Sequence, residues 1–507
     1  MEHFLSLVIF FPLLAGIFGI FIEEKNIKIY GICAAIVELI LSIILWFNFG
    51  FLEGNFKFIE FIPFIKNVGI NYFIGIDGIS LFLIILSTFM TLIALISLTI
   101  KERIKHLVIS ILALEMTMIG VFAALDGILF YIFWELSLIP MLYIIGAWGS
   151  GKRIYAAVKF FIYTFFGSVF MLFGLIFMAY LCYKTNGSFS FNILDWQRLE
   201  IPFNYQIWLF LAFSIAFAIK TPLFPFHTWL PYAHGQAPTI GSVLLAAVLL
   251  KMGTYGFVRF SLPIFPDASL YFADMMCVIA IIMIIYTSFI AFAQKDLKQV
   301  IAYSSIAHMG VIMLGIFSFT IEGISGAVFL MLSHGIVSGG LFMLVGFIYE
   351  RKHTKLMSEF GGLAKVMPFY AFTFCVVLLG SIGLPLTIGF VGEFLSLLGI
   401  FKYEPIYAFL GGFGIIMGAI YSMNLYKKTF FGPVIHEENC KLKDLNVMEN
   451  FAIVPICILV IVLGVYPKPV LSQIDVSSSV IVNQMSQKSL TKMQIRLQRL
   501  NFIKDEK

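Results

Sequence analysis

The chain alternates between long apolar runs and short charged segments. Runs of about 20 apolar residues, the length that crosses a bilayer as an α-helix, recur between loops that hold most of the lysines and arginines. The predicted fold class is therefore an all-α polytopic membrane protein. The pattern predicts about 14 transmembrane helices, over residues 4–22, 29–49, 76–99, 107–125, 128–148, 156–182, 206–231, 239–260, 271–293, 300–319, 323–348, 368–400, 405–430 and 450–466.

Two of these spans are interrupted. In the seventh, Pro222 and Pro225 follow Lys220, and the twelfth carries Pro385 among several glycines. Proline removes a backbone donor from a helix, and matched Gly/Pro-interrupted spans are typical of inverted-repeat transporters. We therefore predict discontinuous helices 7 and 12, within two inverted five-helix repeats formed by spans 4–8 and 9–13. We also expect the carbonyl groups freed by the prolines to solvate the Lys220 ammonium.

This repeat pattern divides the chain into four parts. Residues 1–106 form an N-terminal three-helix segment, residues 107–260 the first five-helix repeat, and residues 261–430 the second repeat. Residues 431–507 form a final helix and a basic amphipathic tail. The apolar run from Phe4 to Ile22 has no basic region before it and no small-residue cleavage site after it, so we predict a retained helix there.

Basic residues are unevenly shared between the two sides of the predicted membrane. Loops after odd-numbered spans carry clusters such as Lys101, Arg103 and Lys105, whereas loops after even-numbered spans carry fewer. Because cytoplasmic loops are rich in lysine and arginine, both termini are predicted to be periplasmic, in a multi-pass protein of the bacterial cytoplasmic (inner) membrane. The tail from Ser486 to Lys507 opposes this by charge, and its apolar spacing from Leu490 to Leu500 suits an interfacial helix.

Composition agrees with the span pattern. The chain has 507 residues, of which 61% are hydrophobic and 12% charged, with a mean hydropathy of +0.99; soluble domains carry about 25% charged residues. The net charge of +5 comes from short loops, and no basic patch of the kind that binds nucleic acid is present. The six cysteines lack CxxC spacing, so the sequence offers no iron–sulfur or zinc site.

Ionisable side chains interrupt the apolar interior of spans five, seven and eight. Glu135 lies among apolar and aromatic residues in LFYIFWELSLIPMLY, so we expect its carboxyl group to be paired, or neutral and hydrogen-bonded to a facing helix. Lys220 precedes the break, and Lys251 follows VLLAAVLL. A charge at bilayer depth costs about 3 kcal/mol, so both lysines are candidate functional residues. Snorkelling to the headgroups is the alternative for Lys220, whereas Lys251 is too central for it.

Later spans contribute histidines and another acid. A neutral imidazole accepts a proton on one nitrogen and donates from the other, so a relay from the lysines to Glu393 in the twelfth span is one interpretation. Satisfied structural histidines are a second, and haem ligation is a third that lacks paired histidines along one helix. Glu38 and Glu115 have no supporting context, and we expect them to be structural. Four histidines lie in or near spans: His227, His234, His308 and His334.

Several long strings in spans four to thirteen resemble the antiporter-like subunits of respiratory complex I. They are IFWELSLIPMLY, KTPLFPFHTWLPYAHGQAPT, LLKMGTYG, KDLKQVIAYSSIAHMG, LSHGIVSGGLF and GFVGEF. The resemblance implies a proton-pumping subunit of an NADH:quinone oxidoreductase translocase, with no redox site on this chain. It also implies roles for matching residues: Glu135 and Lys220 as a charge pair, Lys251 as the central relay, His308 and His334 as the link onward, and Glu393 as the terminal acid.

The acid in the twelfth span separates the branches of this family. Sibling subunits usually carry lysine there, whereas the M type, chain 4 of the mitochondrial complex, carries glutamate, so Glu393 resembles the M type. The implied partners are other membrane subunits of complex I, including L-type and N-type antiporter-like subunits, with lipid, protons and internal waters. We expect no cofactor and no metal on this chain, and no nucleic acid partner.

Three other functions remain as alternatives. The chain could be a subunit of a multisubunit sodium/proton antiporter, which shares the architecture and most of the motifs. It could instead be a structural spacer between pumping modules, or a haem-bearing membrane oxidoreductase. The proteins that co-purify with the chain distinguish an antiporter subunit from a complex I subunit. The visible spectrum of the purified chain tests the haem-bearing alternative.

Overall fold

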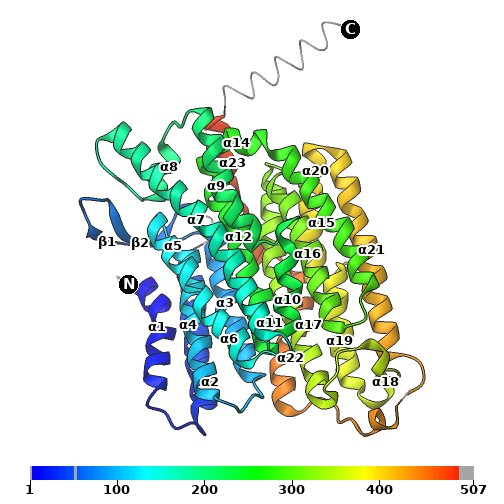
Figure 1. The fold of residues 1–507 in the computed structure, drawn as a ribbon. Helices are drawn as coiled ribbons and strands as arrows, with labels where there is room; N and C mark the ends of the chain where they lie inside the picture. Colours follow the sequence, from blue (N-terminus) through cyan, green and yellow to red (C-terminus); the bar gives the residue numbers. More distant parts are fainter. Residues whose placement is uncertain (1–2, 51–53, 435, 490–507) are drawn as a thin grey trace, which may run out of the picture.

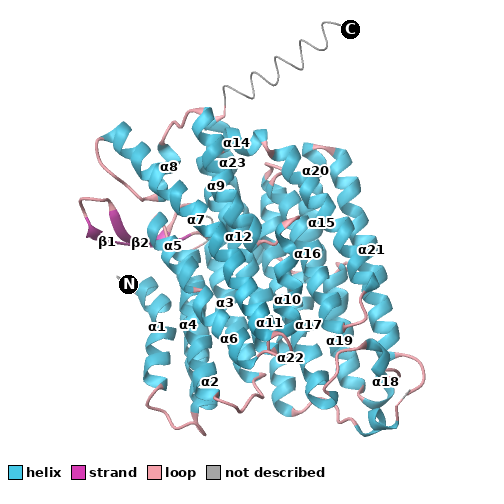
Figure 2. Ribbon diagram, viewed as in Figure 1, coloured by secondary structure: helices cyan, strands magenta, loops and turns pink. Residues whose placement is uncertain are grey.

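The computed structural model describes residues 3–50, 54–434 and 436–489, and its helices stand side by side in one bundle (Figure 1; Figure 2). Each helix closes its own backbone hydrogen bonds, which is the condition for crossing hydrocarbon. Of the described helices, 12 are long and apolar enough to span a membrane. The first predicted span is a shorter apolar helix, and the twelfth is broken in two. Every predicted span therefore has a helical counterpart, and the all-α membrane fold class is confirmed.

The first part of the chain combines helices with one β-hairpin that the sequence pattern did not predict. Its two strands are antiparallel. The elements are α1 (Phe4–Gly19), α2 (Ile27–Phe49), β1 (Lys57–Ile65), β2 (Ile70–Ile76), α3 (Gly78–Ile96), α4 (Ile104–Ala123), α5 (Gly127–Leu136), α6 (Leu138–Trp148), α7 (Arg153–Asn186), α8 (Ile193–Arg198), α9 (Phe203–Lys220), the 3₁₀ turn η1 (Phe226–Thr228) and α10 (Trp229–Gln236).

The second part opens with a span that contains two wide, π-helical segments, η2 and η3. The elements are α11 (Thr239–Leu244), η2 (Leu245–Leu249), α12 (Leu250–Gly256), η3 (Phe257–Ser261), α13 (Leu262–Ile264), α14 (Pro266–Tyr271), α15 (Ala273–Ala293), α16 (Leu297–Ile316), α17 (Ile321–Lys352), η4 (Met357–Glu359), α18 (Leu363–Val366), α19 (Pro368–Ile382), α20 (Ile388–Tyr403), α21 (Pro405–Phe430), η5 (Glu437–Lys441), α22 (Val447–Val465) and α23 (Lys468–Lys488).

The interruption of the seventh span lies between α9 and α10, as predicted. The freed carbonyl group of Ala218 accepts from the backbone N–H of Leu223 (2.8 Å), and that of Ile219 accepts from Trp229 Nε1 (2.8 Å). These oxygens therefore have protein donors already. The expectation that they solvate Lys220 is wrong, because its Nζ donates to the Ser137 hydroxyl group, between α5 and α6, and to no carbonyl group of the described residues.

The interruption of the twelfth span lies between α19 and α20. Gly383 ends α19 with a φ of 74°, a left-handed conformation that glycine adopts without steric cost. The four residues that follow carry the chain into α20. Discontinuous helices 7 and 12 are thus present, while the four-part division of the chain remains a prediction.

Two spans form the centre of the bundle. The spans 239–264 and 321–352 are buried along their whole apolar windows, whereas α2, α21 and α22 expose most of theirs. A helix that is apolar all round is expected to be enclosed by others. Lys251 and His334 lie on these two central spans, so both are placed as far from lipid as the fold allows.

The loops after odd-numbered spans gather at the lower end in Figure 1, which we call the basic end. They are tied to one another: Lys28 Nζ donates to Leu98 O (2.5 Å), and the backbone N–H of Leu297 donates to Lys355 O (2.9 Å). We call the other end, with α8, α14 and α23, the opposite end.

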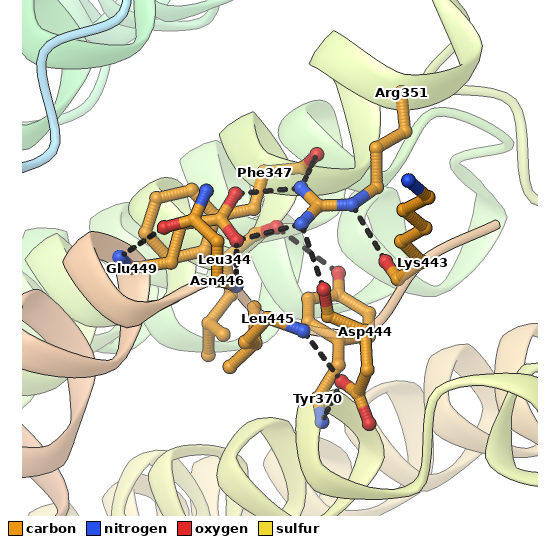
Figure 3. A network of polar contacts seen from close by, with 9 residues as sticks. All are labelled: Leu344, Phe347, Arg351, Tyr370, Lys443, Asp444, Leu445, Asn446 and Glu449. Carbon is orange, nitrogen blue, oxygen red and sulfur yellow. Dashed lines mark hydrogen bonds and ion pairs between the residues drawn. The ribbon is translucent and has the colours of Figure 1, made fainter.

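A polar network fixes three helix ends at the basic end (Figure 3). Arg351 of α17 donates through Nη1 and Nη2 to the two carboxylate oxygens of Glu449 on α22 (2.6 Å each). Asp444, just before α22, accepts from the backbone N–H groups of Phe369 and Tyr370 at the start of α19 (2.9 Å each). Bidentate arginine–carboxylate contacts set geometry as well as energy, so this network aligns α17, α19 and α22.

The amphipathic helix of the C-terminal region is α23, which begins earlier than the predicted tail. It packs against α3, α13 and α17 at the opposite end. Its buried face recurs every three to four residues, through Val470, Ile474, Ser477 and Ile481. The predicted apolar spacing from Leu490 to Leu500 lies outside the described residues.

Candidate functional site

Lys251 and His334 are in direct contact at the centre of the bundle. Lys251, fully buried in α12, donates to the backbone oxygen of Ala246 in η2, and its Nζ lies 2.7 Å from His334 Nδ1 on α17. π-helical segments occur frequently at functional sites, and here one supplies the carbonyl group. A charged lysine donates to Nδ1 and a neutral one accepts from it, so the contact is compatible with both protonation states of Lys251.

From His334 the polar side chains continue to Glu393. The rings of His334 and His308 have centroids 5.5 Å apart, and His308 Nδ1 lies 3.1 Å from Glu393 Oε1. His334 Nε2 is buried and has no partner among the described atoms. Lys251, His334, His308 and Glu393, which we call the polar row, therefore run from α12 through α17 and α16 to α20.

The end of the polar row borders a small cavity. It has a volume of about 10 Å³ and is lined by His308, Ser381, Glu393 and Tyr421 among others, about the least volume that holds one water. Ser381 Oγ lies 3.4 Å from His308 Nε2. The break between α19 and α20 thus brings Glu393 beside His308, with room for one water molecule.

Gly383 makes that placement possible, which gives a first testable prediction. A Cβ atom there would collide with the Glu393 carboxylate, and the φ of 74° disfavours any side chain. We expect Gly383→Ala to displace Glu393 from His308 and to lower proton pumping at least about tenfold, which corresponds to about 1.4 kcal/mol. The measurement is proton uptake into sealed vesicles. Gly412→Ala is the control, because nothing lies near its added Cβ; equal effects of both variants would contradict the prediction.

Lys220 lies at the last turn of α9 in an aromatic pocket. Its side chain is fully buried, and Nζ donates to Ser137 Oγ at 3.4 Å. The ammonium also lies 5.2 Å from the ring centroid of Trp134 and 5.8 Å from that of Phe160. Cation–π contacts of this kind hold a charge in a dry site more weakly than a carboxylate would.

Glu135 lies near Lys220 without forming a close ion pair. It is partly exposed on α5 and interacts electrostatically with Lys220 on α9 and with the Ser168 hydroxyl of α7. Its Oε1 is buried with no hydrogen-bond partner among the described residues. The structure therefore places the two predicted members of the charge pair within electrostatic reach, with Glu135 towards the outside of the bundle.

Lys220 and Lys251 flank the point where α9 and α12 cross. A Cβ on Gly253 would meet Phe217 O and the backbone nitrogen of Thr221, so the two helices touch there. Thr221 Oγ1 is buried and has no partner among the described atoms. Its hydroxyl group lies at the crossing, against Gly253.

Two further residues, His234 and Lys298, were not part of the relay predicted from the sequence. His234 of α10 is fully buried and stacks on Phe342 (centroids 4.3 Å apart, 13° between planes), with both ring nitrogens unpartnered among the described residues. It interacts electrostatically with both Lys298 and Lys251. His234 lies in one of the motifs that carry the family resemblance. Lys298 was assigned to a loop from the sequence, so its burial was not predicted.

Lys298 borders a cavity at the basic end. The cavity has a volume of about 420 Å³ and is lined in part by Thr99, Trp148, Lys298, Glu350 and Lys355. Lys298 Nζ donates to Ala237 O at 2.7 Å. Burial lowers the pKa of the Lys355 ammonium in the loop after α17, against a smaller opposing effect of Asp296. The cavity therefore offers titratable groups on the route from the basic end towards His234.

The remaining candidates stay outside the polar row. His227 lies between the rings of Phe224 (5.7 Å) and Tyr286 (5.9 Å), as a structural residue does. Glu38 on α2 and Glu115 on α4 are fully buried, and within the described part of the chain their oxygens have no hydrogen-bond partner. No three His, Cys, Asp or Glu side chains of the described residues cluster in a way that could hold a metal ion.

Comparisons with known proteins agree with this architecture. The family described as "NADH:quinone oxidoreductase/Mrp antiporter, TM" matches residues 124–418. NADH-quinone oxidoreductase subunit M of Rickettsia prowazekii is 46% identical over 93% of this chain and 97% of its own length. A chain of respiratory complex I from Thermus thermophilus has a TM-score of 0.87 and 29% identity, covering 95% of this chain and 99% of that one.

A structure of the Mrp complex from Dietzia sp. shares the fold, with a TM-score of 0.83, coverage of 96% and 99%, and only 16% identity. At that identity the likeness concerns the fold alone. The higher identities and nearly complete coverage are with complex I subunits, and they agree with the resemblance of Glu393 to the M type. The chain belongs to the family of NADH:quinone oxidoreductase and Mrp antiporter membrane subunits, as an antiporter-like subunit of the complex I M type.

Proposed function

We propose that this chain pumps protons through Glu135, Lys220, Lys251, His334, His308 and Glu393, coupled to quinone reduction elsewhere in the complex. The observation that carries the proposal is the polar row, in which Lys251 touches His334 (2.7 Å) and His308 touches Glu393 (3.1 Å) in the centre of a membrane bundle. Buried ionisable residues of this kind mark proton relays. In this proposal, water molecules bridge the wider steps of the relay.

The Glu135–Lys220 pair supplies the switch in this proposal. Moving one proton against about 150 mV requires roughly 3.5 kcal/mol, at about 2.3 kcal/mol per charge per 100 mV. A change of about 2.5 units in the pKa of one carrier corresponds to that energy. Because Lys220 has aromatic rings and one hydroxyl around it, its charge depends on the field of Glu135. Neutralising or moving Glu135 would release the Lys220 proton towards Lys251.

Proton uptake is proposed to occur at the basic end. The cavity there reaches Lys298, and His234 lies within electrostatic reach of both Lys298 and Lys251. By the positive-inside rule we assign this end to the cytoplasm, and with it we assign both termini to the periplasm of a bacterial inner-membrane protein. The relay then delivers the proton sideways to Glu393, on the far side of the bundle from Lys220.

The family also suggests which subunits neighbour this chain and which chains carry the redox cofactors. We propose L-type and N-type antiporter-like subunits as membrane partners, and electron carriers only on other chains of the complex. A sodium/proton antiporter subunit is the second candidate. Glu393 favours the complex I function, since the sibling proteins usually carry lysine there. Co-purification with quinone-reducing subunits distinguishes the two, and purification with antiporter subunits alone would favour the second.

Replacement of Lys220 tests the proposal. Lys220→Ala is expected to abolish most proton pumping in normally assembled membranes, because Lys220 is the only titratable side chain in the last two turns of α9. Lys220→Arg is also expected to impair pumping, since a guanidinium group effectively never deprotonates. The measurement is protons moved per NADH oxidised in sealed vesicles. Unchanged pumping in both Lys220→Ala and Glu393→Gln would show that the relay is wrong.

A further inference from the structure

A second buried polar cluster lies beyond Lys251, towards the opposite end. It consists of Asp77, Ser80, Tyr255 and Arg259, and we call it the Asp77–Arg259 layer. Tyr255 and Arg259 follow Lys251 by four and eight residues in the same span, so Arg259 lies about 12 Å further along the helix axis, at 1.5 Å per residue. Asp77 and Ser80 come from the start of α3.

Each side chain of the layer forms a hydrogen bond or an ion pair with another side chain of the layer. Arg259 Nη2 lies 2.6 Å from Asp77 Oδ2 and donates to Ser80 Oγ at 3.3 Å, while Arg259 Nε donates to Tyr255 OH at 3.1 Å. Asp77 Oδ1 accepts from the backbone N–H groups of Ile79 and Ser80 (3.1 and 2.9 Å). No side-chain atom of these four residues is among the buried polar atoms without a partner in the described structure.

The directions of these hydrogen bonds are also fixed. Arginine only donates, so Ser80 Oγ accepts from Arg259 and its own proton points to Tyr255 OH, 3.0 Å away. Tyr255 OH in turn donates to the backbone oxygen of Phe122 at 2.9 Å. The sequence of donors therefore ends on a carbonyl group, which cannot pass a proton on.

The layer is covered on its outer side. The Arg259 guanidinium lies 4.8 Å from the ring centroid of Phe56. The C-terminal helix α23 packs against α3 and α13, and Ser477 Oγ accepts from the backbone N–H of Gly78, next to Asp77 (2.9 Å). The residues around Lys251 differ, because His334 Nε2, Thr221 Oγ1 and both nitrogens of His234 are unpartnered within the described chain.

We propose that the Asp77–Arg259 layer seals Lys251 from the periplasmic side, so that a proton on Lys251 leaves only sideways through His334. The inference rests on the proposed function above. A proton relay needs groups that accept on one side and donate on the other. The guanidinium stays charged, and its partner carboxylate is held by three donors. A fixed arginine is also one way in which membrane pores exclude protons and cations.

The test is the passive proton leak of vesicles that hold the assembled complex without NADH. A potassium gradient with valinomycin drives the leak, and a trapped pH dye reports it. We expect Asp77→Asn with Arg259→Gln to raise the leak by about tenfold or more, as a barrier lowered by about 1.4 kcal/mol does. Adding Lys251→Met should return the leak to the wild-type level, because the opened route passes Lys251.

A control uses a second arginine–carboxylate pair of the described residues. Arg351→Gln with Glu449→Gln neutralises a pair at the basic end, in which the carboxylate is buried and the arginine side chain is 16% exposed, and we expect no added leak. A wild-type leak in the assembled Asp77/Arg259 variant would overturn the proposal. So would an equal leak in the control, or a leak that Lys251→Met leaves unchanged. If the Asp77/Arg259 double variant does not assemble, Arg259→Lys replaces it, since lysine keeps the charge but can release its proton. A wild-type leak in that variant also overturns the proposal.

These outcomes are separable from a failure of the relay. A wrong relay appears as normal pumping in Lys220→Ala and Glu393→Gln, in which the layer is intact. A wrong seal appears as an unchanged leak in the Asp77/Arg259 variant, whatever those two variants do.

Discussion

Replacing Lys251 by methionine is expected to remove proton transport through this chain while the complex still assembles. Methionine fills a similar volume but has no titratable group, so nothing connects the crossing of α9 and α12 to His334. A proton would have to cross that gap as a charge in hydrocarbon surroundings. At a cost of at least about 3 kcal/mol, transfer slows by more than about a hundredfold. The measurement is protons moved per NADH oxidised in sealed vesicles.

Lys159→Met provides the matched control for this result. Lys159 is another membrane-helix lysine, partly exposed on α7 with its ammonium over the ring of Tyr232 (4.2 Å to the centroid), and it has no part in the polar row. We expect the complex that carries Lys159→Met to pump protons normally. Equal pumping by the Lys251→Met complex and the Lys159→Met complex would exclude Lys251 as an obligatory carrier. It would leave the chain as a spacer between pumping modules.

Glu393→Gln is expected to have the second largest effect. Glutamine keeps the shape but cannot accept a proton, so His308 loses the acceptor that lies 3.1 Å from its Nδ1. We expect pumping to fall at least about tenfold, which corresponds to a barrier raised by about 1.4 kcal/mol. Glu393→Asp is expected to retain part of the activity, because a carboxyl group remains beside the small cavity.

The control for Glu393 is the exposed acid Glu322. Glu322 pairs with Lys402 (2.5 Å) at the opposite end, outside the polar row. Glu322→Gln is expected to leave pumping unchanged, which separates a specific loss from a general effect of removing an acid. If Glu393→Gln pumped as well as Glu322→Gln, the terminal acid of the relay would lie elsewhere.

Much of the fold could be predicted because a bilayer imposes one simple length rule. Each predicted span has a helix, and the breaks beside Lys220 and Glu393 fall where proline and glycine interrupt the apolar runs. The β-hairpin 57–76 and the helix α23 were missed. They lie outside the spans, where the length rule does not apply, and most of β1 is exposed.

Only part of the candidate site could be predicted from the sequence. Buried charges stand out in apolar runs, which identified Lys251 and Glu393. Their contacts depend on distant helices: the order His334 then His308 comes from the packing of α17 between α12 and α16, and no local pattern encodes it. Lys298 looked like an ordinary loop charge, because its burial arises only when α10 and the loop after α17 close over it.

The central claim is that Lys251 and Glu393 belong to one path. The most direct measurement is the number of protons pumped per NADH oxidised by the assembled complex carrying Lys251→Met, Glu393→Gln or both. Groups that act in series are not additive, so the double variant is predicted to lose no more than the more severe single variant. Losses that add in the double variant would contradict the account, since they would mean that the two residues serve separate proton paths.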